Sequence, residues 1–338
     1  MKVVTFGEIM LRLAPEGYTR FLQTDKYLAT YGGGEANVAV SLANFGEDAS
    51  YVTKLPDNEI GQGAINSLRA LGVDTTKIVR GGDRVGIYFL EKGASQRPSK
   101  VIYDRAGSSI AKASLSDFDW EEIFKGADWF HFTGITPALS PEMVEVTLEA
   151  CKKAKEMGVT ISCDLNYRKK LWTKKEAELA MTPIVKYVDV LIANEEDAND
   201  VFGITAGNDV TKGEVEKDAY KKVATALMAK FDNLKYVAIT LRGSISANDN
   251  RWSGMLTDGN EFWFAKEYLI HIVDRVGGGD SFGAGLIYGL NHYEPARALE
   301  FAVAASCLKH TIEGDYNYST VEEVLKLADG DGSGRVVR

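Results

Sequence analysis

The chain has 338 residues, of which 45% are hydrophobic and 26% charged, and its formal net charge is −9. These values are typical of a soluble globular protein with one large core, and so acidic a chain is a poor match for nucleic acid. No apolar run approaches the length of a membrane span and no signal-peptide pattern begins the chain. We therefore expect a cytoplasmic protein that does not bind membranes.

Cysteines and histidines show no pattern that points to chemistry. Cys151, Cys163 and Cys307 are far apart in apolar or mixed surroundings, so we expect them to be reduced packing residues. The four histidines lack the spacing of metal ligands and are expected to be structural or surface residues.

The first third of the chain alternates strand and helix patterns with segments that break them. Residues 2–8 form a β-branched run that is typical of a buried parallel strand, and three glycines at 32–34 lead into an apolar helix. Residues 11–31 lose this character, and residues 85–106 hold two strand patterns joined by a polar turn. We expect these two segments to form a small sheet that stands off the main body as a lid.

From residue 128 onward, strands and helices alternate regularly. Strands are predicted at 129–133, 160–166, 189–193, 236–241, 252–256 and 261–265, and helices at 142–157, 173–186, about 214–231, 295–309 and 321–328. This order predicts one doubly wound α/β domain over residues 1–328, with a mostly parallel sheet covered by helices on both faces. Residues 329–338 are expected to be a flexible tail.

Polar residues follow several predicted strands directly. They are Asn166 and Arg168, the run 194–197, and the run 240–244. Ligands of open α/β sheets bind beyond the C-terminal ends of the parallel strands. We therefore expect these residues to face one site.

The stretch 273–289 combines three consecutive glycines with an acid at the start of a helix pattern. Gly277, Gly278 and Gly279 precede Asp280. Free backbone amides at a helix N-terminus attract anions, phosphate above all, and an acid beside a bound phosphate can take a proton from an attacking hydroxyl. A tight turn followed by an ordinary acid at a helix start has the same pattern, and the stretch matches neither common nucleotide-binding fingerprint.

Three motifs, in order along the chain, resemble those of the ribokinase-type (PfkB) carbohydrate kinases. They are Gly32-Gly33-Gly34-x-x-Asn37, Asn194-Glu195-Glu196 and Asp274-x-x-Gly277-x-Gly279-Asp280, and the resemblance spans essentially the whole chain. Three further segments are most similar to the family members that act on 2-keto-3-deoxygluconate: GIYFLE at 86–91, YDRAGS at 103–108 and DLNYRKKLW at 164–172.

The resemblance implies a ribokinase-like fold with a small β lid, and ATP and Mg²⁺ as cofactors. It implies transfer of the ATP γ-phosphoryl group to the terminal 6-hydroxyl of the sugar acid, in sugar-acid breakdown. It also implies a homo-oligomer, because the lid often contributes to a dimer contact in this family.

The resemblance assigns Asp280 as the catalytic base and Gly277, Gly278 and Gly279 as the anion cradle. A guanidinium grips a carboxylate well, and a neutral sugar does not need one, so two arginines would select the acid. The implied substrate-binding residues are Gly33, Gly34, Asn37, Tyr88, Tyr103, Arg105, Arg168 and Asp280. Surface ion pairs for the arginines, and lid packing for the tyrosines, are the alternatives.

The nucleotide side departs further from the family pattern. The implied nucleotide-binding residues are Asn194, Thr240, Arg242, Gly243, Gly277, Gly279, Ser306 and Asn317, with Glu196 or Asp197 acting on Mg²⁺ through water. Arg242 replaces an expected glycine and is as consistent with facing solvent as with binding phosphate. Arg275 replaces a common threonine, Gly278 replaces a common alanine, and the loop at 244–254 is longer than usual.

The acceptor remains open at this stage. 2-Keto-3-deoxygalactonate, fructose or a nucleoside are rivals within the kinase class. A catalytically silent sugar-acid-binding module is the rival from another class, and the retained Asp280 argues against it.

Overall fold

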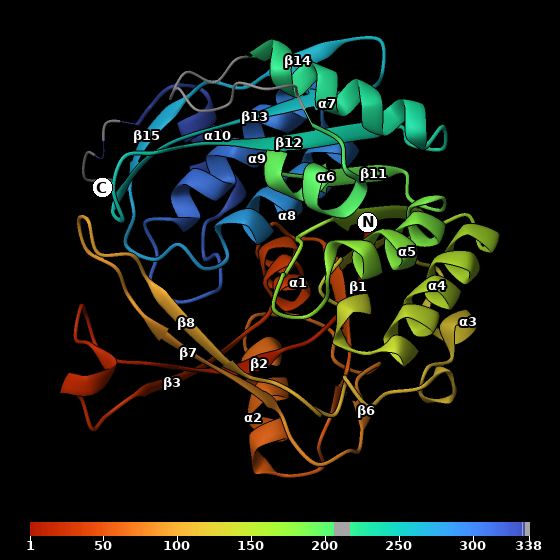
Figure 1. Cartoon of the computed structure of the whole chain (residues 1–338), viewed down its shortest axis with the longest axis vertical. Helices are drawn as coiled ribbons and strands as arrows, with labels where there is room; N and C mark the ends of the chain where they lie inside the picture. The colour runs from red at the N-terminus through yellow and green to blue at the C-terminus, as the bar shows by residue number, and fades with distance from the viewer. Residues whose placement is uncertain (206–216, 333, 335–338) are drawn as a thin grey trace.

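The computed structural model describes residues 1–205, 217–332 and 334, and in this part of the chain a nine-stranded sheet forms the centre. Six neighbouring strands pair in parallel, and three more extend one edge as antiparallel strands (Figure 1). The parallel strands, in order across the sheet, are β12 (Tyr236–Ser244), β11 (Val190–Ala193), β10 (Thr160–Asp164), β9 (Trp129–Thr133), β1 (Lys2–Phe6) and β4 (Asp48–Val52). The antiparallel edge consists of β13 (Asp249–Thr257), β14 (Phe262–Phe264) and β15 (Tyr268–His271).

Helices cover both faces of this sheet, because successive strand residues point to opposite sides. Val3 and Val4 are both fully buried, yet they belong to two different core clusters, one on each face. One cluster includes residues of α1 (Gly34–Asn44), α2 (Glu59–Arg69), α8 (Gly278–His292), α9 (Pro295–Lys309) and α10 (Val321–Ala328). The other includes residues of α3 (Trp120–Ile123), α4 (Pro141–Glu156), α5 (Lys174–Val185), α6 (Glu195–Phe202) and α7 (Lys217–Lys230). The predicted doubly wound α/β fold is confirmed.

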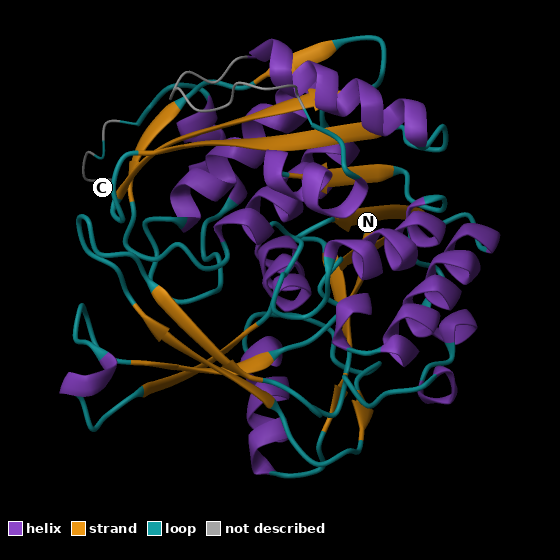
Figure 2. Ribbon diagram, in the orientation of Figure 1, coloured by secondary structure: helices purple, strands orange, loops and turns teal. Residues whose placement is uncertain are grey.

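A separate four-stranded sheet forms the lid (Figure 2). Its strands, in order, are β3 (Leu28–Gly32), β2 (Met10–Ala14), β7 (Gly86–Glu91) and β8 (Lys100–Asp104), drawn from the two segments in which the sequence predicts it. Shorter elements complete the described chain: the strand pair β5 (Lys54–Leu55) and β6 (Val79–Arg80), and 3-10 turns at Phe21–Gln23, Leu115–Asp117 and Pro137–Leu139.

One predicted loop is too long. The segment between residues 241 and 252 is mostly strand, because β12 and β13 continue as a long hairpin in which Arg242 pairs with Trp252 and Ser244 with Asn250, and only residues 245–248 form the turn. The polar side chains of residues 242–244 and 249–251 show no strand pattern in the sequence, and these residues form strands because they pair with each other across the hairpin. The first residues of the helix predicted at 214–231, and residues 333 and 335–338 of the predicted tail, lie outside the described residues. No helix of the described chain is long and apolar enough to cross a membrane.

Helices α8 and α9 pack unusually closely, and this explains the small residues of α8. A Cβ added to Gly285 would lie 2.8 Å from the Cα of Ala302, and one added to Gly289 would lie 2.7 Å from the Cα of Ala298. Only glycine permits this backbone approach. Because α8 begins at the glycine stretch, its contact with α9 fixes where that stretch lies.

Two glycine variants on this one helix test the contact. Gly289→Ala should lower the free energy of unfolding by about 1–3 kcal/mol, because the new methyl group is overpacked. Gly283→Ala is the matched control: its methyl would meet only the Cδ1 of Ile192, at 3.5 Å. Its better helix propensity should leave stability unchanged or raise it by up to ~1 kcal/mol. Urea unfolding of both variants measures the difference, and equal stabilities would contradict the close packing.

Candidate active site

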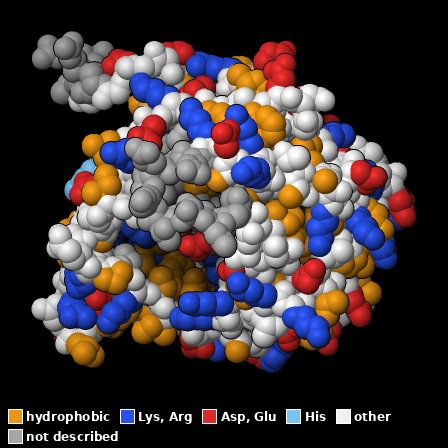
Figure 3. Space-filling model, turned by 45° about the horizontal axis from the view of Figure 1, so that its top comes forward, with side chains coloured by type: hydrophobic (Ala, Val, Ile, Leu, Met, Phe, Trp, Pro, Cys, Tyr) orange, Lys and Arg blue, Asp and Glu red, His pale blue; other side chains and the backbone are white. Residues whose placement is uncertain are grey.

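A cavity of about 360 Å³ lies between the lid and the C-terminal ends of the parallel strands. Figure 3 shows the molecule hollowed in this region, with Lys and Arg side chains around the hollow. The predicted site residues that line the cavity are Gly33, Gly34, Asn37, Tyr88, Tyr103, Arg105, Arg168, Asn194, Asp197, Thr240, Arg242, Gly277, Gly279 and Asp280. Those that do not line it are Glu196, Gly243, Gly278, Ser306 and Asn317.

The glycine stretch forms the N-terminus of α8, and each glycine has its own reason. Gly277 is the N-cap with a left-handed φ of 82°, and no side chain caps the helix. At Gly278 a Cβ would lie 2.5 Å from the Nε2 of His310, whereas at Gly279 it would meet nothing within 4 Å. The amides of Gly279 and Asp280 lie in the first turn, where an α-helix supplies no carbonyl partner. They are therefore available to an anion.

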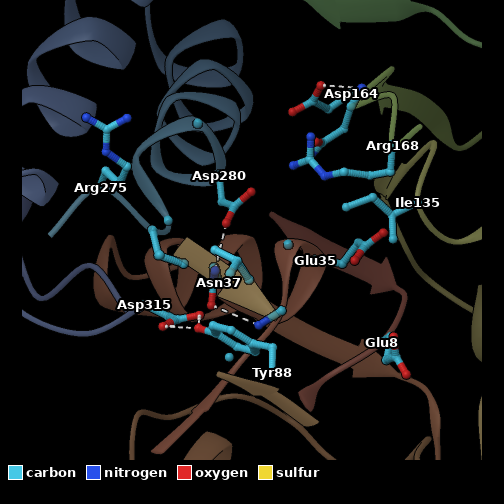
Figure 4. Close-up of a pocket in the computed structure, with 18 of the residues that line it drawn as sticks. Glu8, Glu35, Asn37, Tyr88, Ile135, Asp164, Arg168, Arg275, Asp280 and Asp315 are labelled. Carbon is cyan, nitrogen blue, oxygen red and sulfur yellow. Dashed lines mark hydrogen bonds between the residues drawn. The ribbon is translucent and has the colours of Figure 1, made fainter. Parts of the chain in front are cut away.

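Asp280 lies on the floor of the cavity and is held by one neutral partner (Figure 4). Asn37 donates from Nδ2 to the Asp280 carboxylate at 2.7 Å, and its own Oδ1 accepts from the backbone of Gly33 at 3.3 Å. Burial raises the pKa of Asp280 to about 6, against the hydrogen bond from Asn37, and the nearby acid Glu35 adds to the rise. A carboxylate with this pKa is ionised at neutral pH and is a stronger base than an ordinary aspartate. Asn37 thus orients Asp280, a role that the sequence did not suggest.

Of the two arginines predicted to grip a carboxylate, the structure leaves one free. Arg105 donates from Nε to Glu8 at 2.7 Å, and Ser108 donates to the same carboxylate. Arg168 is exposed and donates only to the backbone oxygen of Tyr167, at 3.2 Å, with no acid within ion-pair distance among the described residues. Arg168 is therefore the better placed of the two to receive a negatively charged group.

The two lid tyrosines face each other across β7 and β8, but they differ in exposure. Tyr88 pairs with Tyr103 in the strand register, and their ring centroids are 6.2 Å apart. Tyr88 is only 4% exposed, and its hydroxyl donates to Asp315 at 2.6 Å. Tyr103 is 38% exposed and remains the tyrosine of this pair that is open to a ligand.

The acids proposed to act on Mg²⁺ lie at the start of α6. Asn194 and Asp197 form a reciprocal cap, and Asp197 also accepts from the backbone of Tyr167 at 2.9 Å. Burial raises the pKa of Asp197 to about 6, against these backbone bonds. Because both oxygens of Asp197 already accept backbone hydrogen bonds, direct coordination would disrupt the cap. No group of three or more metal-binding side chains exists among the described residues.

The remaining nucleotide-side residues divide into two groups. Thr240 and Arg242 line the cavity from β12, and the Arg242 guanidinium lies over the ring of Trp252, 5.2 Å from its centroid. Ser306 and Asn317 are instead buried behind the glycine stretch, where Ser306 donates to the Gly278 carbonyl at 2.7 Å and Asn317 donates to Ser281 at 2.8 Å. They support α8 from behind, and their predicted contact with nucleotide stays a prediction.

Sequence reasoning missed a buried charged group behind the cavity. Arg12, from the lid strand β2, donates to Asp274 at 2.5 Å and to Asp315 at 2.6 Å. Lys309, at the end of α9, is also fully buried nearby. Arg12 is 262 and 303 positions away from its two partners in the chain, and no local pattern signals that they meet.

The cost of burying Asp280 predicts a variant that is more stable than the natural protein. The folded-state pKa of about 6 lies above the ordinary value of 3.8, so stability is lost as the pH rises through 6. Asp280→Asn should therefore unfold a few degrees higher than the natural protein at pH 8, and the gap should close at pH 4. Asp189→Asn is the opposite control. The Ile161 amide and two lysines outweigh burial and lower the pKa of Asp189, so this variant should be destabilised at pH 8. Thermal unfolding at both pH values measures the opposite stability changes of the two variants. Destabilisation of Asp280→Asn at pH 8 would contradict a stability cost of the buried Asp280 carboxylate.

The chain is similar to known proteins over nearly its whole length. The chain is 56% identical to 2-dehydro-3-deoxygluconokinase from Thermotoga maritima, whose crystal structure superposes with a TM-score of 0.93 over 98% of both chains. It is 34% identical over 336 residues to 2-dehydro-3-deoxygalactonokinase of Haloferax volcanii, which covers 98% of each chain. A protein from Escherichia coli solved with ATP and Mg²⁺ shares the fold, with a TM-score of 0.79 at 22% identity over 97% of this chain and 99% of that one. The model of the pfkB family carbohydrate kinases matches residues 1–321, and the chain belongs to this family.

Proposed function

We propose that this protein transfers the γ-phosphoryl group of ATP to the 6-hydroxyl of 2-keto-3-deoxygluconate (2-dehydro-3-deoxygluconate), as an enzyme of sugar-acid breakdown. One observation carries the proposal. Asp280, with a pKa of about 6, lies at the uncapped N-terminus of α8, in the same cavity as the unpaired Arg168. A base, an anion cradle and a free guanidinium therefore share one enclosed space.

In the proposed reaction, Asp280 accepts the proton of the 6-hydroxyl as its oxygen attacks the γ-phosphorus. The bond from this phosphorus to the bridging oxygen breaks, and ADP leaves with the bond's electrons. The amides of Gly279 and Asp280 stabilise the negative charge on the transferred group, because they point outward at the positive end of the helix. Asn37 keeps the accepting oxygen of Asp280 directed at the cavity.

The residues at the start of α6 fit Mg²⁺ that is bound through water and not coordinated directly. When bound, Mg²⁺ would neutralise negative charge on the nucleotide phosphates. Glu196 is exposed and the carboxylate of Asp197 accepts from the backbone amides of Asn194 and Tyr167, so we propose that both acids hold the ion through water. Thr240 and Arg242, on the neighbouring strand β12, are the chain's own candidates for contacts to phosphate.

The proposed acceptor carries a carboxylate, which the free guanidinium of Arg168 would bind bidentately. This disfavours fructose and nucleosides, which have no carboxylate. 2-Keto-3-deoxygalactonate remains the second candidate, because the Haloferax volcanii relative is named for it and the two acids differ only in stereochemistry. A silent binding module would have no use for a buried base that costs stability.

We also propose that the protein forms a homo-oligomer through the lid. Large apolar side chains are exposed on β3 and β8 and on the segment between β2 and β3, namely Tyr18, Leu22, Tyr27, Leu28 and Ile102. Leu22 is completely exposed. A second copy would cover these side chains, since monomers rarely leave so many apolar groups open on one small element.

A coupled assay of ADP release tests the reaction. The natural protein should phosphorylate 2-keto-3-deoxygluconate more efficiently than fructose or a nucleoside. Asp280→Asn should bind ATP normally and lose about 10²-fold or more in kcat, because a general base contributes that much. The control is Asp189→Asn, which makes the same Asp-to-Asn change outside the cavity. Near-natural turnover of Asp280→Asn would remove Asp280 from the base role.

The carboxylate contact is tested by comparing two arginines. Arg168→Ala should raise KM for the sugar acid about tenfold or more, since a charge-assisted bidentate contact is lost. Arg168→Lys should recover part of the loss. The matched control is Arg84→Ala, which removes an arginine outside the cavity that pairs with Asp104 at 2.9 Å. An unchanged KM in Arg168→Ala would show that another group binds the carboxylate.

A further inference from the structure

The side chain of Lys309 runs directly beneath the glycine stretch. It is 0% exposed, and its Cε would lie 3.1 Å from a Cβ on Gly277. Its ammonium donates to the backbone oxygen of Ile312 at 3.1 Å and to that of Asp274 at 3.5 Å. Asp274 opens the segment that leads to Gly277, so the ammonium ties this segment to the chain that follows α9.

Two carbonyl oxygens are weak compensation for a buried ammonium. No carboxylate lies within ion-pair distance of Lys309 among the described residues, and the two nearest acids, Asp274 and Asp315, are already bound by Arg12. Burying a charge costs several kcal/mol unless it is paired, and an apolar side chain of similar size usually serves a core better. Packing alone therefore does not account for a lysine here.

We propose that Lys309 is a positioning residue for phosphoryl transfer, whose ammonium draws together the carbonyls of Asp274 and Ile312 and so holds the glycine amides toward the cavity. This inference rests on the proposed kinase function. The ammonium also places a positive charge behind the cradle, on the side away from the cavity. Lys309 does not line the cavity, and it acts through the backbone of residues 274–277.

The groups around Lys309 make its charge sensitive to pH. Burial lowers the pKa of Lys309 to about 8, against the opposing effect of Asp274 and Asp315. The charged and titratable groups that act on Lys309 are Arg12 (β2), Asp274, Asp280 (α8), Asp315 and the adjacent His310, and Tyr88 (β7) donates to one of them, Asp315. Burial lowers the pKa of His310 to about 4 and raises that of Tyr88 well above its ordinary value, so both are neutral near pH 8. Lys309 is then the group in this set that loses its charge as the pH rises through 8.

Lys309→Met removes the charge and keeps the length of the side chain. We expect kcat and the affinity for a non-hydrolysable ATP analogue each to fall about tenfold, as for other residues that support a site from behind it. KM for the sugar acid should stay unchanged, and the thermal midpoint should stay equal or rise. The fall of kcat above pH 8 in the natural protein should be absent from the residual activity of the variant. Thr311→Ala, which loses only a hydroxyl bond to Leu308 near the same helix end, is the matched control.

Chemical rescue tests the positive charge separately from the rest of the lysine side chain. Lys309→Ala leaves room for a small cation, and added ethylammonium should restore kcat in a saturable way that ethanol does not. Natural kcat and nucleotide affinity in folded Lys309→Met would overturn the inference, as would loss of folding in both variants without rescue. Nucleotide binding is measured without an acceptor. Failure of the natural protein to phosphorylate any sugar acid would therefore refute the proposed function while leaving the role of Lys309 testable.

Discussion

The double ion pair of Arg12 is the interaction on which the arrangement of the cavity depends. One guanidinium from the lid strand β2 binds Asp274, which precedes the glycine stretch, and Asp315, which follows α9. Asp274 in turn accepts from the amides of Val276 and Gly314, so the same carboxylate shapes both backbone segments. Tyr88 adds a second lid contact to Asp315. The lid is thus joined to the base of the anion cradle, and the two walls of the cavity share one buried charge cluster.

The cavity also has an electrostatic cost, because it buries several carboxylates. Burial raises the pKa values of Asp164, Asp197 and Asp280, and the charges of Asp197 and Asp280 add to the rise at Asp164. Elsewhere, acids near lysines and backbone amides, such as Asp189, have lowered pKa values and add to stability. The described acids whose pKa values burial raises, namely Glu35, Asp164, Asp197, Asp280 and Asp315, all line the cavity. Such confinement is typical of functional sites, where stability is given up for reactivity.

Local sequence patterns predict the fold well because the core depends on local periodicity. The alternation of strands and helices, and glycine stops such as Gly158 at the end of α4, are properties of short segments. The hairpin of β12 and β13 was missed at Arg242–Ser244 because its strand character comes from residues 250–252. The site residues also divide into those with a local sequence pattern and those that depend on a distant partner. Asp280 and Gly277 are recognisable in place, whereas the pairing of Arg105 with Glu8 joins residues 97 positions apart. No spacing rule reports such a partner, and yet it decides which arginine is free.

The proposed function assigns the free and the occupied polar groups to two halves of the cavity. On the acceptor side, Arg168 and Tyr103 are open, and both lie on segments that the lid and β10 hold at the rim. On the nucleotide side, the cradle is made of backbone, and side chains such as Ser306, Asn317 and Lys309 support it from behind. Exposed side chains can change without disturbing the core, whereas supporting side chains are constrained by packing on every side. Differences in acceptor among related chains should therefore arise at positions such as Arg168 and Tyr103, while the chemistry at Asp280 stays the same.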